Sequence, residues 1–304
     1  MSSPVPQNSP APEVVCIGES MVLITPVASR LAEAETAAIG HAGAEANVAV
    51  GLVAAGHRAA WASRLGDDPL GDRLSSELER RRVQLWVERD ATAPTGMMFK
   101  DPGIESSDVY YYRRGSAASA MAPGFLSAER LAGVRIVHTT GITPALSPTC
   151  LDMVDQLFAD ARAAGATVSF DVNDRRPLWS REHAAATLAR LADAADITFV
   201  GRDEAERIWG TATPDEIRAF LPSCALLVVK DGDVGATAFA HGADPVFVAA
   251  PRVEVVEPVG AGDAFASGFL AATLEERSIG ERLSAGHAAA ARVLVTHADM
   301  PPID

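Results

Sequence analysis

The feature that most constrains this chain is a regular alternation of short apolar runs and longer segments with helical spacing. The apolar runs have the length of buried strands, and they lie at residues 14–18, 59–63, 135–140, 167–172, 197–200 and 225–230. Strand, helix and strand in this rhythm predict an α/β fold with a mostly parallel, doubly wound sheet and helices on both faces. Folds of this kind bind ligands beyond the carboxyl ends of their strands.

Three of the helical segments carry terminal signals that support this interpretation. They are expected at 44–56, 69–82 and 147–165, and the first and the third end at a glycine, which readily adopts the left-handed conformation that ends many helices. The second follows Asp68 and the third starts at Ser147, and proline comes next in both cases. These signals predict where the helices begin and end.

Two regions break the rhythm, because their strand-like runs follow one another without a helix between them. These runs lie at 22–27, 36–40, 95–101 and 108–114. We expect them to form a small accessory sheet from about 20–42 and 93–114 that projects over the ligand edge as a lid, and whose exposed strands allow a homodimer to form edge to edge. A second exception, at 235–240 and 245–250, predicts a β-hairpin.

Length and charge narrow the classes of function. The chain has 304 residues, enough for one large α/β domain or two small ones, and its formal net charge is −14. An acidic chain repels polyphosphate backbones and anionic lipids, so neither nucleic acid nor a membrane surface is an expected partner. The sequence begins without a signal-peptide pattern and contains no apolar run long enough to span a membrane, so we expect a cytoplasmic protein.

Residues 1–12 are rich in proline and serine, and we expect a disordered tail there, followed by one folded domain at 13–304. Cys16, Cys150 and Cys224 lie far apart and are odd in number, so they predict buried small residues and not disulfides or a zinc site.

The sharpest local signal is the turn Gly260-Ala261-Gly262-Asp263, which runs directly into an apolar helix. Unpaired N–H groups and the helix dipole at such a start favour an anion. Asp263 lies where that anion belongs, which suits a carboxylate that acts as a base beside a phosphoryl group. The alternative interpretation is an ordinary first-turn acid, with glycines that only shape the loop.

Rival nucleotide motifs are absent. A dinucleotide fingerprint needs a third glycine where Phe265 stands, and a P-loop needs a lysine after a glycine, whereas neither Lys100 nor Lys230 follows one. The sequence also lacks an HExxH pair and a GxSxG elbow. A dinucleotide-dependent oxidoreductase is therefore disfavoured.

A second glycine-containing segment, 41–49, opens the first long helix and puts Asn47 at an early helical position. Its small residues allow a ligand to approach the backbone, although an ordinary helix start with Asn47 in its first turns explains the same pattern. Together, AGAEANVA (42–49) and EPVGAGDAFASG (257–268) resemble the two signatures of the ribokinase-like (PfkB) carbohydrate kinases, in the family's order and spacing. The resemblance implies a ribokinase-like fold, ATP-dependent phosphorylation of a sugar hydroxyl, and a requirement for Mg²⁺.

The segments 109–119, 141–148 and 171–180 resemble the 2-keto-3-deoxygluconate kinases within that family. The resemblance implies that the terminal hydroxyl of this sugar acid is the acceptor. Two alternatives stay open within the fold, a kinase for a neutral ketose such as fructose and a kinase for another keto-deoxy acid. A third, from a different class, is a non-catalytic sugar or nucleotide sensor.

By the same resemblance Asp263 is the catalytic base, and the turn at Gly260, Ala261 and Gly262 offers N–H groups to the transferring phosphoryl group. The implied sugar-binding residues are Gly43, Asn47, Tyr111, Arg113, Arg175 and Asp299. Arginine forks are well suited to a sugar carboxylate. The implied nucleotide-binding residues are Lys230, Gly232, Gly235, Gly260, Gly262 and His287, the last near the adenine. Glu204 is the acid implied to organise Mg²⁺ through water.

Four residues depart from the family's pattern: Met98, Gly201, Asp231 and Val259. Met98 removes a hydroxyl that the lid often provides, and Gly201 and Asp231 change the expected surroundings of the nucleotide. None of the four alters Asp263.

Overall fold

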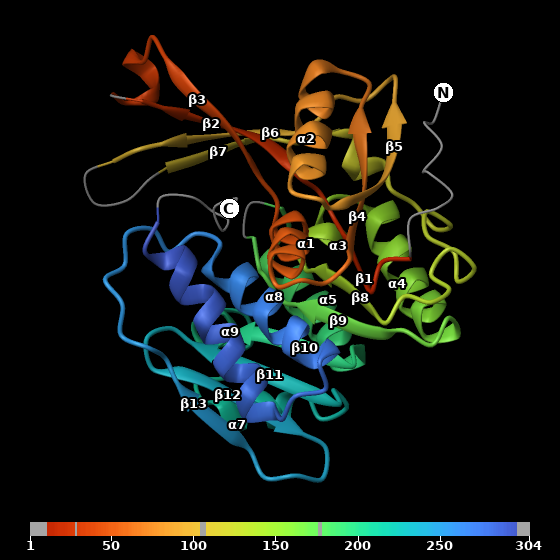
Figure 1. Cartoon of the computed structure of the whole chain (residues 1–304), viewed down its shortest axis with the longest axis vertical. Coiled ribbons are helices and arrows are strands. Elements are labelled where there is room, and N and C mark those ends of the chain that lie inside the picture. Colours follow the sequence, from red (N-terminus) through yellow and green to blue (C-terminus); the bar gives the residue numbers. More distant parts are fainter. Residues whose placement is uncertain (1–10, 28, 104–107, 176–177, 297–304) are drawn as a thin grey trace.

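The computed structural model describes residues 11–27, 29–103, 108–175 and 178–296. Within these residues the core is a nine-stranded sheet (Figure 1). In spatial order its strands are β13 (Val246–Ala249), β12 (Gly235–Ala240), β11 (Leu226–Asp231), β10 (Ile197–Gly201), β9 (Thr167–Asp171), β8 (Ile136–Thr140), β1 (Val14–Ile17), β4 (Ala59–Gly66) and β5 (Gln84–Asp90). All neighbouring pairs are parallel except β11 with β12 and β12 with β13.

Helices cover both faces of this sheet, because successive side chains of each strand point to opposite sides. In β1, Val15 and Ile17 belong to one hydrophobic cluster, and Val14 and Cys16 belong to the other. The first cluster includes residues of α4 (Pro148–Ala163), α5 (Arg181–Ala194), α6 (Arg202–Trp209) and α7 (Pro214–Phe220). The second includes residues of α1 (Ala44–Ala54), α2 (Pro69–Arg80), α8 (Ala261–Leu274) and α9 (Ile279–Leu294). The doubly wound α/β fold is therefore confirmed.

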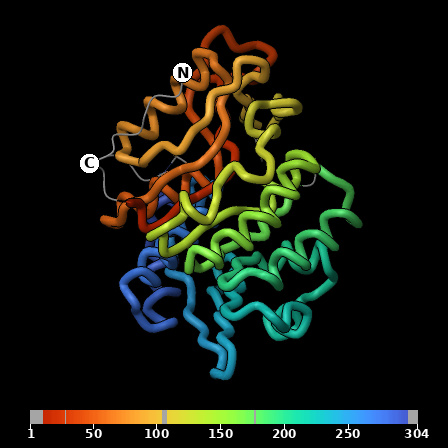
Figure 2. Tube along the Cα trace, turned by 90° about the vertical axis from the view of Figure 1, so that its right-hand side faces the viewer, coloured from red at the N-terminus to blue at the C-terminus, as the bar shows by residue number. Residues whose placement is uncertain are grey.

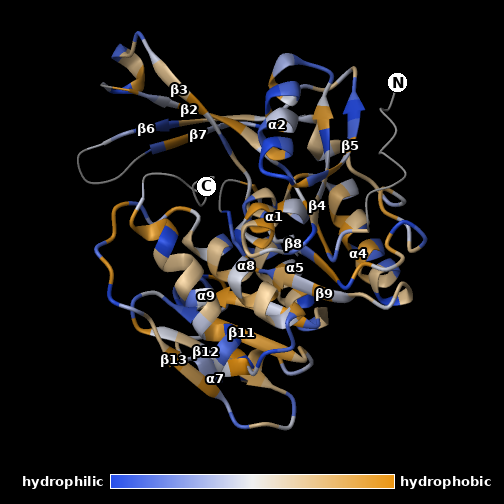
Figure 3. Ribbon diagram, viewed as in Figure 1, coloured by the Kyte–Doolittle hydropathy of each residue, from blue (hydrophilic) through white to orange (hydrophobic). Residues whose placement is uncertain are grey.

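The helices differ in how deeply they are buried. Figure 3 shows hydrophobic residues along α1 and α8 in the centre of the molecule and hydrophilic residues along α2 at its edge. Nearly every residue of α8 after its first turn is buried, whereas α2 buries only one face. Helix α8 is therefore a rigid central element, and its first turn points out of the core.

A second, four-stranded sheet stands apart from the core and is called the small sheet below. It has the order β3 (Ala37–Ala42), β2 (Met21–Pro26), β6 (Met97–Asp101) and β7 (Asp108–Tyr112), with β2 and β6 parallel and the two outer pairs antiparallel. Figure 1 shows it above α1 and the start of α8. Figure 2, from the side, shows the red and yellow N-terminal segments at one end of the molecule and the blue C-terminal part at the other.

The expected helix ends also agree with the structure. Asp68 accepts a hydrogen bond from the Gly71 amide at 2.8 Å, and Ser147 accepts one from the Cys150 amide at 3.1 Å. The three cysteines are buried and free. The edge strand β5 was not predicted, because its half-buried residues lack a continuous apolar run. Residues 1–10 of the expected tail lie outside the described residues. Among the helices that the structure describes, none is both long and apolar enough to cross a membrane.

Candidate active site

A cleft of about 880 Å³ lies between the small sheet and the carboxyl ends of the central strands. Asp171 ends β9, Gly201 ends β10 and Lys230 lies at the end of β11, so the topology alone brings these three residues to one edge. The opposite wall includes Met98 and Tyr111 of the small sheet. The cleft volume is of the size that small-molecule sites have, at about 300–1,000 Å³.

The start of α8 forms the floor of the cleft. Gly260 has a φ of 81°, in the left-handed region, and the helix begins at Ala261, so the chain turns sharply before its first helical N–H groups. Gly260, Gly262 and Asp263 line the cleft. The first turn of α8 therefore presents backbone donors and one carboxylate to the same space.

Asn47 holds the Asp263 carboxylate in place. Its Nδ2 donates a hydrogen bond to Asp263 Oδ2 at 2.8 Å, although the two residues are far apart in the sequence. The contact needs α1 and α8 to pack closely, and a Cβ atom on Gly51 would lie only 2.2 Å from Ser267 Oγ. Asn47, predicted to bind sugar, thus lies in the cleft with its amide bound to Asp263.

The pKa of Asp263 is raised from 3.8 to about 7. Burial is the largest cause, and the charge of Asp171 adds to it. The hydrogen bond from Asn47 and the positive charges of Arg175 and Lys230 oppose the shift. A carboxylate with a pKa near neutrality is suited to accept a proton at physiological pH, because a general base works best when its pKa lies close to the operating pH.

Lys230 supplies a fixed positive charge beside Asp263. Its Nζ donates to Asp171 Oδ2 at 2.7 Å, and a Cβ atom on Gly262 would lie 3.5 Å from that nitrogen. Burial alone would lower the pKa of Lys230, but Asp171, Glu204 and Asp263 raise it above its usual value. The ammonium group therefore stays charged at the start of α8.

Glu204 lies at the same edge, in the first turn of α6. Its carboxylate accepts hydrogen bonds from the Asp174 amide at 2.5 Å and the Gly201 amide at 3.2 Å. Burial and the nearby charge of Asp171 raise its pKa. Among the described residues no group of three or more His, Cys, Asp or Glu side chains forms a metal cage. Glu204 with Asp171 fits a Mg²⁺ ion that takes most of its ligands from water and phosphate, as this ion commonly does.

The residues predicted to contact sugar come from both walls of the cleft. Gly43, Tyr111, Arg113 and Arg175 all line it. Arg113 is buried and forms an ion pair with Glu19, whereas Arg175 is exposed and donates only a long hydrogen bond, 3.5 Å, to the Asp174 carbonyl. Asp299 lies outside the described residues.

Three residues predicted on the nucleotide side are not among those that line this cleft: Gly232, Gly235 and His287. His287 contacts the Val248 carbonyl through Nε2 at 3.1 Å and packs against the ring of Phe265. A Cβ atom on Gly235 would lie 2.4 Å from that same carbonyl. In the structure, His287 and Gly235 thus serve the packing of α9, β12 and β13.

Sequence reasoning missed two acidic residues of the site. Asp171 had a signal, because it stands at the end of a predicted parallel strand, where ligands bind. Glu19 had none, since its importance depends on partners about 95 residues further along the chain, Arg113 and Ser116.

Asp231, one of the four departures from the family's pattern, has a charge partner in the structure. Arg202 Nε donates a hydrogen bond to Asp231 Oδ1 at 2.7 Å.

Comparisons with known proteins agree with this geometry. The sequence matches the model of the pfkB family carbohydrate kinases over residues 11–304. It is 34% identical over 296 residues to the 2-dehydro-3-deoxygluconokinase of Bacillus subtilis (strain 168). That alignment covers 95% of this chain and 91% of the relative. The chain is 31% identical over 305 residues to the 2-dehydro-3-deoxygalactonokinase of Haloferax volcanii, with 95% and 92% covered. A solved PfkB protein from Polaromonas sp. JS666 superposes with a TM-score of 0.86 at 35% identity, over 93% of this chain and 96% of that one.

Proposed function

This chain belongs to the pfkB family of carbohydrate kinases, and from that premise we propose that it transfers the γ-phosphate of ATP to the terminal hydroxyl of 2-keto-3-deoxygluconate, also called 2-dehydro-3-deoxygluconate. The observation that carries the reaction type is Asp263, a carboxylate with a pKa near 7 that Asn47 holds at the start of α8. The small sheet acts as the lid of this site.

In the proposed reaction Asp263 removes the proton of the sugar hydroxyl as the oxygen attacks the γ-phosphorus. A new O–P bond forms, the bond between the γ-phosphorus and the bridging oxygen breaks, and ADP leaves with that oxygen. The N–H groups at the start of α8 and the ammonium of Lys230 stabilise the charge on the transferring group. When bound, Mg²⁺ neutralises phosphate charge, and Glu204 and Asp171 are the residues that fit it.

The acidic substrate is supported by the exposed charge of Arg175. This guanidinium lines the cleft and forms no ion pair with a carboxylate among the described residues, although its charge acts on Asp263, so its N–H groups are available to a carboxylate of the substrate. Two of the relatives are named as kinases of 2-dehydro-3-deoxygluconate and 2-dehydro-3-deoxygalactonate. Both compounds are sugar acids, so these relatives support an acidic sugar as the substrate class. The galactonate compound is therefore the second candidate acceptor.

The substrate assignment is tested by measuring ADP release with 2-keto-3-deoxygluconate, its galactonate counterpart and fructose. We expect the highest kcat/KM with the gluconate compound and little turnover of fructose. Preference for fructose would overturn the acidic substrate, and preference for the galactonate compound would select the second candidate. ATP binding without turnover of any acceptor would support the sensor alternative.

Replacing Arg175 by alanine is expected to raise KM for the acidic sugar by about tenfold or more and to leave KM for a neutral sugar unchanged, because only the acid loses a charge-assisted hydrogen bond. Steady-state kinetics with both sugars checks this. Arg190→Ala on α5 is the matched control, since it removes the same charge from an exposed pair with Asp155. Equal effects of Arg175→Ala on both sugars would show that Arg175 does not bind the carboxylate.

The pKa of Asp263 predicts an acidic limb in the pH profile. Because the base acts only when ionised, kcat/KM is expected to be half-maximal near pH 7 and to reach a plateau at higher pH. The same pKa shift affects the stability of the fold in the opposite direction, because it favours the protonated form of Asp263 in the folded state. A carboxyl whose pKa rises from 3.8 on folding favours the folded state at low pH, and this contribution is lost as pH rises through about 7. A kcat/KM profile that is flat between pH 5 and 8 would contradict the assignment of the base.

A further inference from the structure

The small sheet is joined to the core at four places in the chain, and all four meet at Glu19. The connections are residues 18–20 between β1 and β2, residue 43 between β3 and α1, residues 91–96 between β5 and β6, and residues 113–116 after β7. Glu19 itself belongs to the first of them. Its side chain is only 2% exposed, so its carboxylate must find its partners within the protein.

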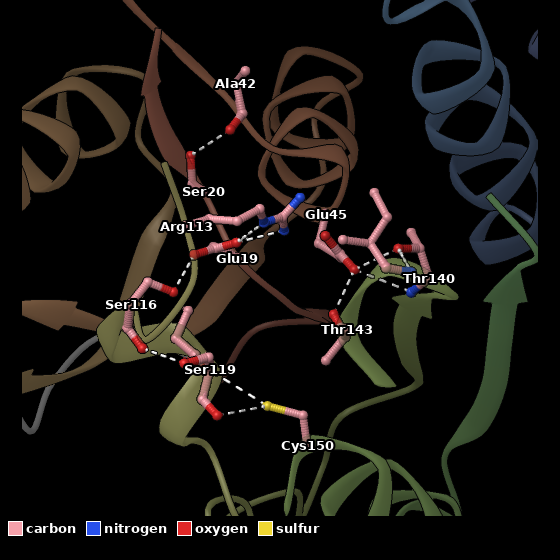
Figure 4. Close-up of polar contacts among 12 residues, drawn as sticks. Glu19, Ser20, Ala42, Glu45, Arg113, Ser116, Ser119, Thr140, Thr143 and Cys150 are labelled. Carbon is pink, nitrogen blue, oxygen red and sulfur yellow. Dashed lines mark hydrogen bonds and ion pairs between the residues drawn. The ribbon is translucent and has the colours of Figure 1, made fainter. Parts of the chain in front are cut away.

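The carboxylate of Glu19 binds the fourth connection directly. Arg113 donates from Nε to Glu19 Oε2 at 2.6 Å and forms a second contact through Nη2, and Ser116 Oγ donates to Oε1 at 2.5 Å (Figure 4). Arg113 is itself 7% exposed. Three polar contacts thus link the first connection to the fourth.

The other two connections pack closely against Glu19 or its neighbour, in each case at a glycine. A Cβ atom on Gly96 would lie 2.7 Å from Glu19 Oε1. A Cβ atom on Gly43 would lie 2.7 Å from the Glu19 carbonyl oxygen and 2.8 Å from Ser20 Cα. Next to this contact, Ser20 Oγ donates to the Ala42 carbonyl at 3.5 Å (Figure 4). Glu19 is therefore the point about which the small sheet is attached.

The same contacts determine how Arg113 meets the cleft. Its guanidinium carries five N–H groups in a rigid plane, and the edge formed by Nε and Nη2 lies on Glu19. Arg113 also lines the cleft, where its guanidinium lies 5.8 Å from the ring centre of Tyr111. The remaining N–H groups of a guanidinium held in this way have a fixed direction, which a free side chain lacks.

We propose that Glu19 is a positioning residue for sugar binding, which acts through Arg113 by fixing its guanidinium at the cleft and by fixing the small sheet above it. The inference rests on the proposed function, because it assumes that a bound sugar contacts Arg113. A buried ion pair that served stability alone would leave KM for sugar unchanged in every variant that stays folded.

A double-mutant cycle separates the two roles. With the preferred sugar of the wild-type enzyme, Glu19→Gln is expected to raise KM for sugar by about tenfold and to leave KM for ATP within about twofold. Arg113→Met is expected to raise KM for sugar at least as much. In the Arg113→Met background, Glu19→Gln should add a much smaller increase than it causes alone, because the residue through which it acts on the sugar is gone. Additive effects would overturn the proposal.

Each single variant leaves one buried charge unpaired and is at risk of unfolding, whereas the double variant leaves none. Ser116→Ala is the milder second variant, because it removes one hydrogen bond to Glu19 and no charge. It is expected to raise KM for sugar by about two- to fivefold and to have a smaller effect when Arg113 is methionine. An unchanged KM for sugar in Ser116→Ala and Glu19→Gln would count against the proposal.

Asp196→Asn is the matched control. Asp196 is a half-buried carboxylate that accepts a hydrogen bond from the Val168 amide at 2.7 Å and forms an ion pair with Arg162 at 3.9 Å, and both partners belong to the core and not to a connection of the small sheet. We expect its KM for sugar to stay at the wild-type value.

Hydrogen exchange measured without ligand distinguishes failure of this inference from failure of the proposed function. Amide exchange in β2 and β6 is expected to accelerate in Glu19→Gln and to stay unchanged in Asp196→Asn. Wild-type enzyme that turns over none of the sugars would refute the proposed function. Unchanged exchange in Glu19→Gln would refute the positioning role.

Discussion

Replacing Asp263 by asparagine is expected to lower kcat by about 10²–10⁴-fold and to leave the Kd for sugar nearly unchanged, because this is the range that loss of a general base commonly produces. The asparagine side chain has the same shape, and its carbonyl oxygen is able to accept the hydrogen bond that Asn47 donates to Asp263. The geometry of the first turn of α8 is therefore retained while the ability to take a proton is lost. Single-turnover ADP release and calorimetric sugar binding measure the two quantities.

The control for this variant is Asp72→Asn. Asp72 also lies in the first turn of a helix, α2, but its side chain is 74% exposed and does not line the cleft. If Asp263 only favoured the helix dipole, the two substitutions would have similarly small effects on activity. Full activity in Asp263→Asn would rule out Asp263 as the base.

The parts of the site that could be predicted from the sequence are those whose chemistry is local. The start of α8 is an example, because glycine, a turn and an acidic first helical turn are neighbours in the chain. The parallel core could be predicted for the same reason, since each strand and helix carries its own apolar pattern and end signals. Strand β5 could not, because an edge strand with half-buried residues has no strong pattern.

Contacts between residues far apart in the chain could not be predicted. The sequence puts Asn47 near a helix start, but its hydrogen bond to Asp263 depends on the close packing of α1 and α8. The family resemblance assigns Arg113 to the sugar, whereas its pairing with Glu19 depends on the way the connections of the small sheet converge. Charge partners of this kind are set by tertiary structure, so a single sequence gives no signal for them.

Replacing Lys230 by methionine is expected to lower kcat by about 10²–10³-fold, the usual effect of removing one preorganised group that stabilises transition-state charge. Methionine has similar length and no charge, so it removes the ammonium that Asp171 holds beside the start of α8. Kinetics at saturating ATP and sugar measure the loss, and circular dichroism shows whether the variant is folded. Lys230→Arg keeps the charge and should retain more of the activity than Lys230→Met.

The pH profile provides a second readout that a purely structural role of Lys230 would not change. The positive charge of Lys230 lowers the pKa of Asp263, and the negative charge of Asp171 raises it, while Arg175 and Asn47 act in the same direction as Lys230. Lys230→Met should therefore move the acidic limb of kcat/KM to higher pH, and Asp171→Asn should move it to lower pH. Opposite shifts of one limb, produced by the two members of a single ion pair, would locate both charges at the base. A limb that stays near pH 7 in both variants would mean that neither charge acts on Asp263 and that the loss of kcat in Lys230→Met has another cause.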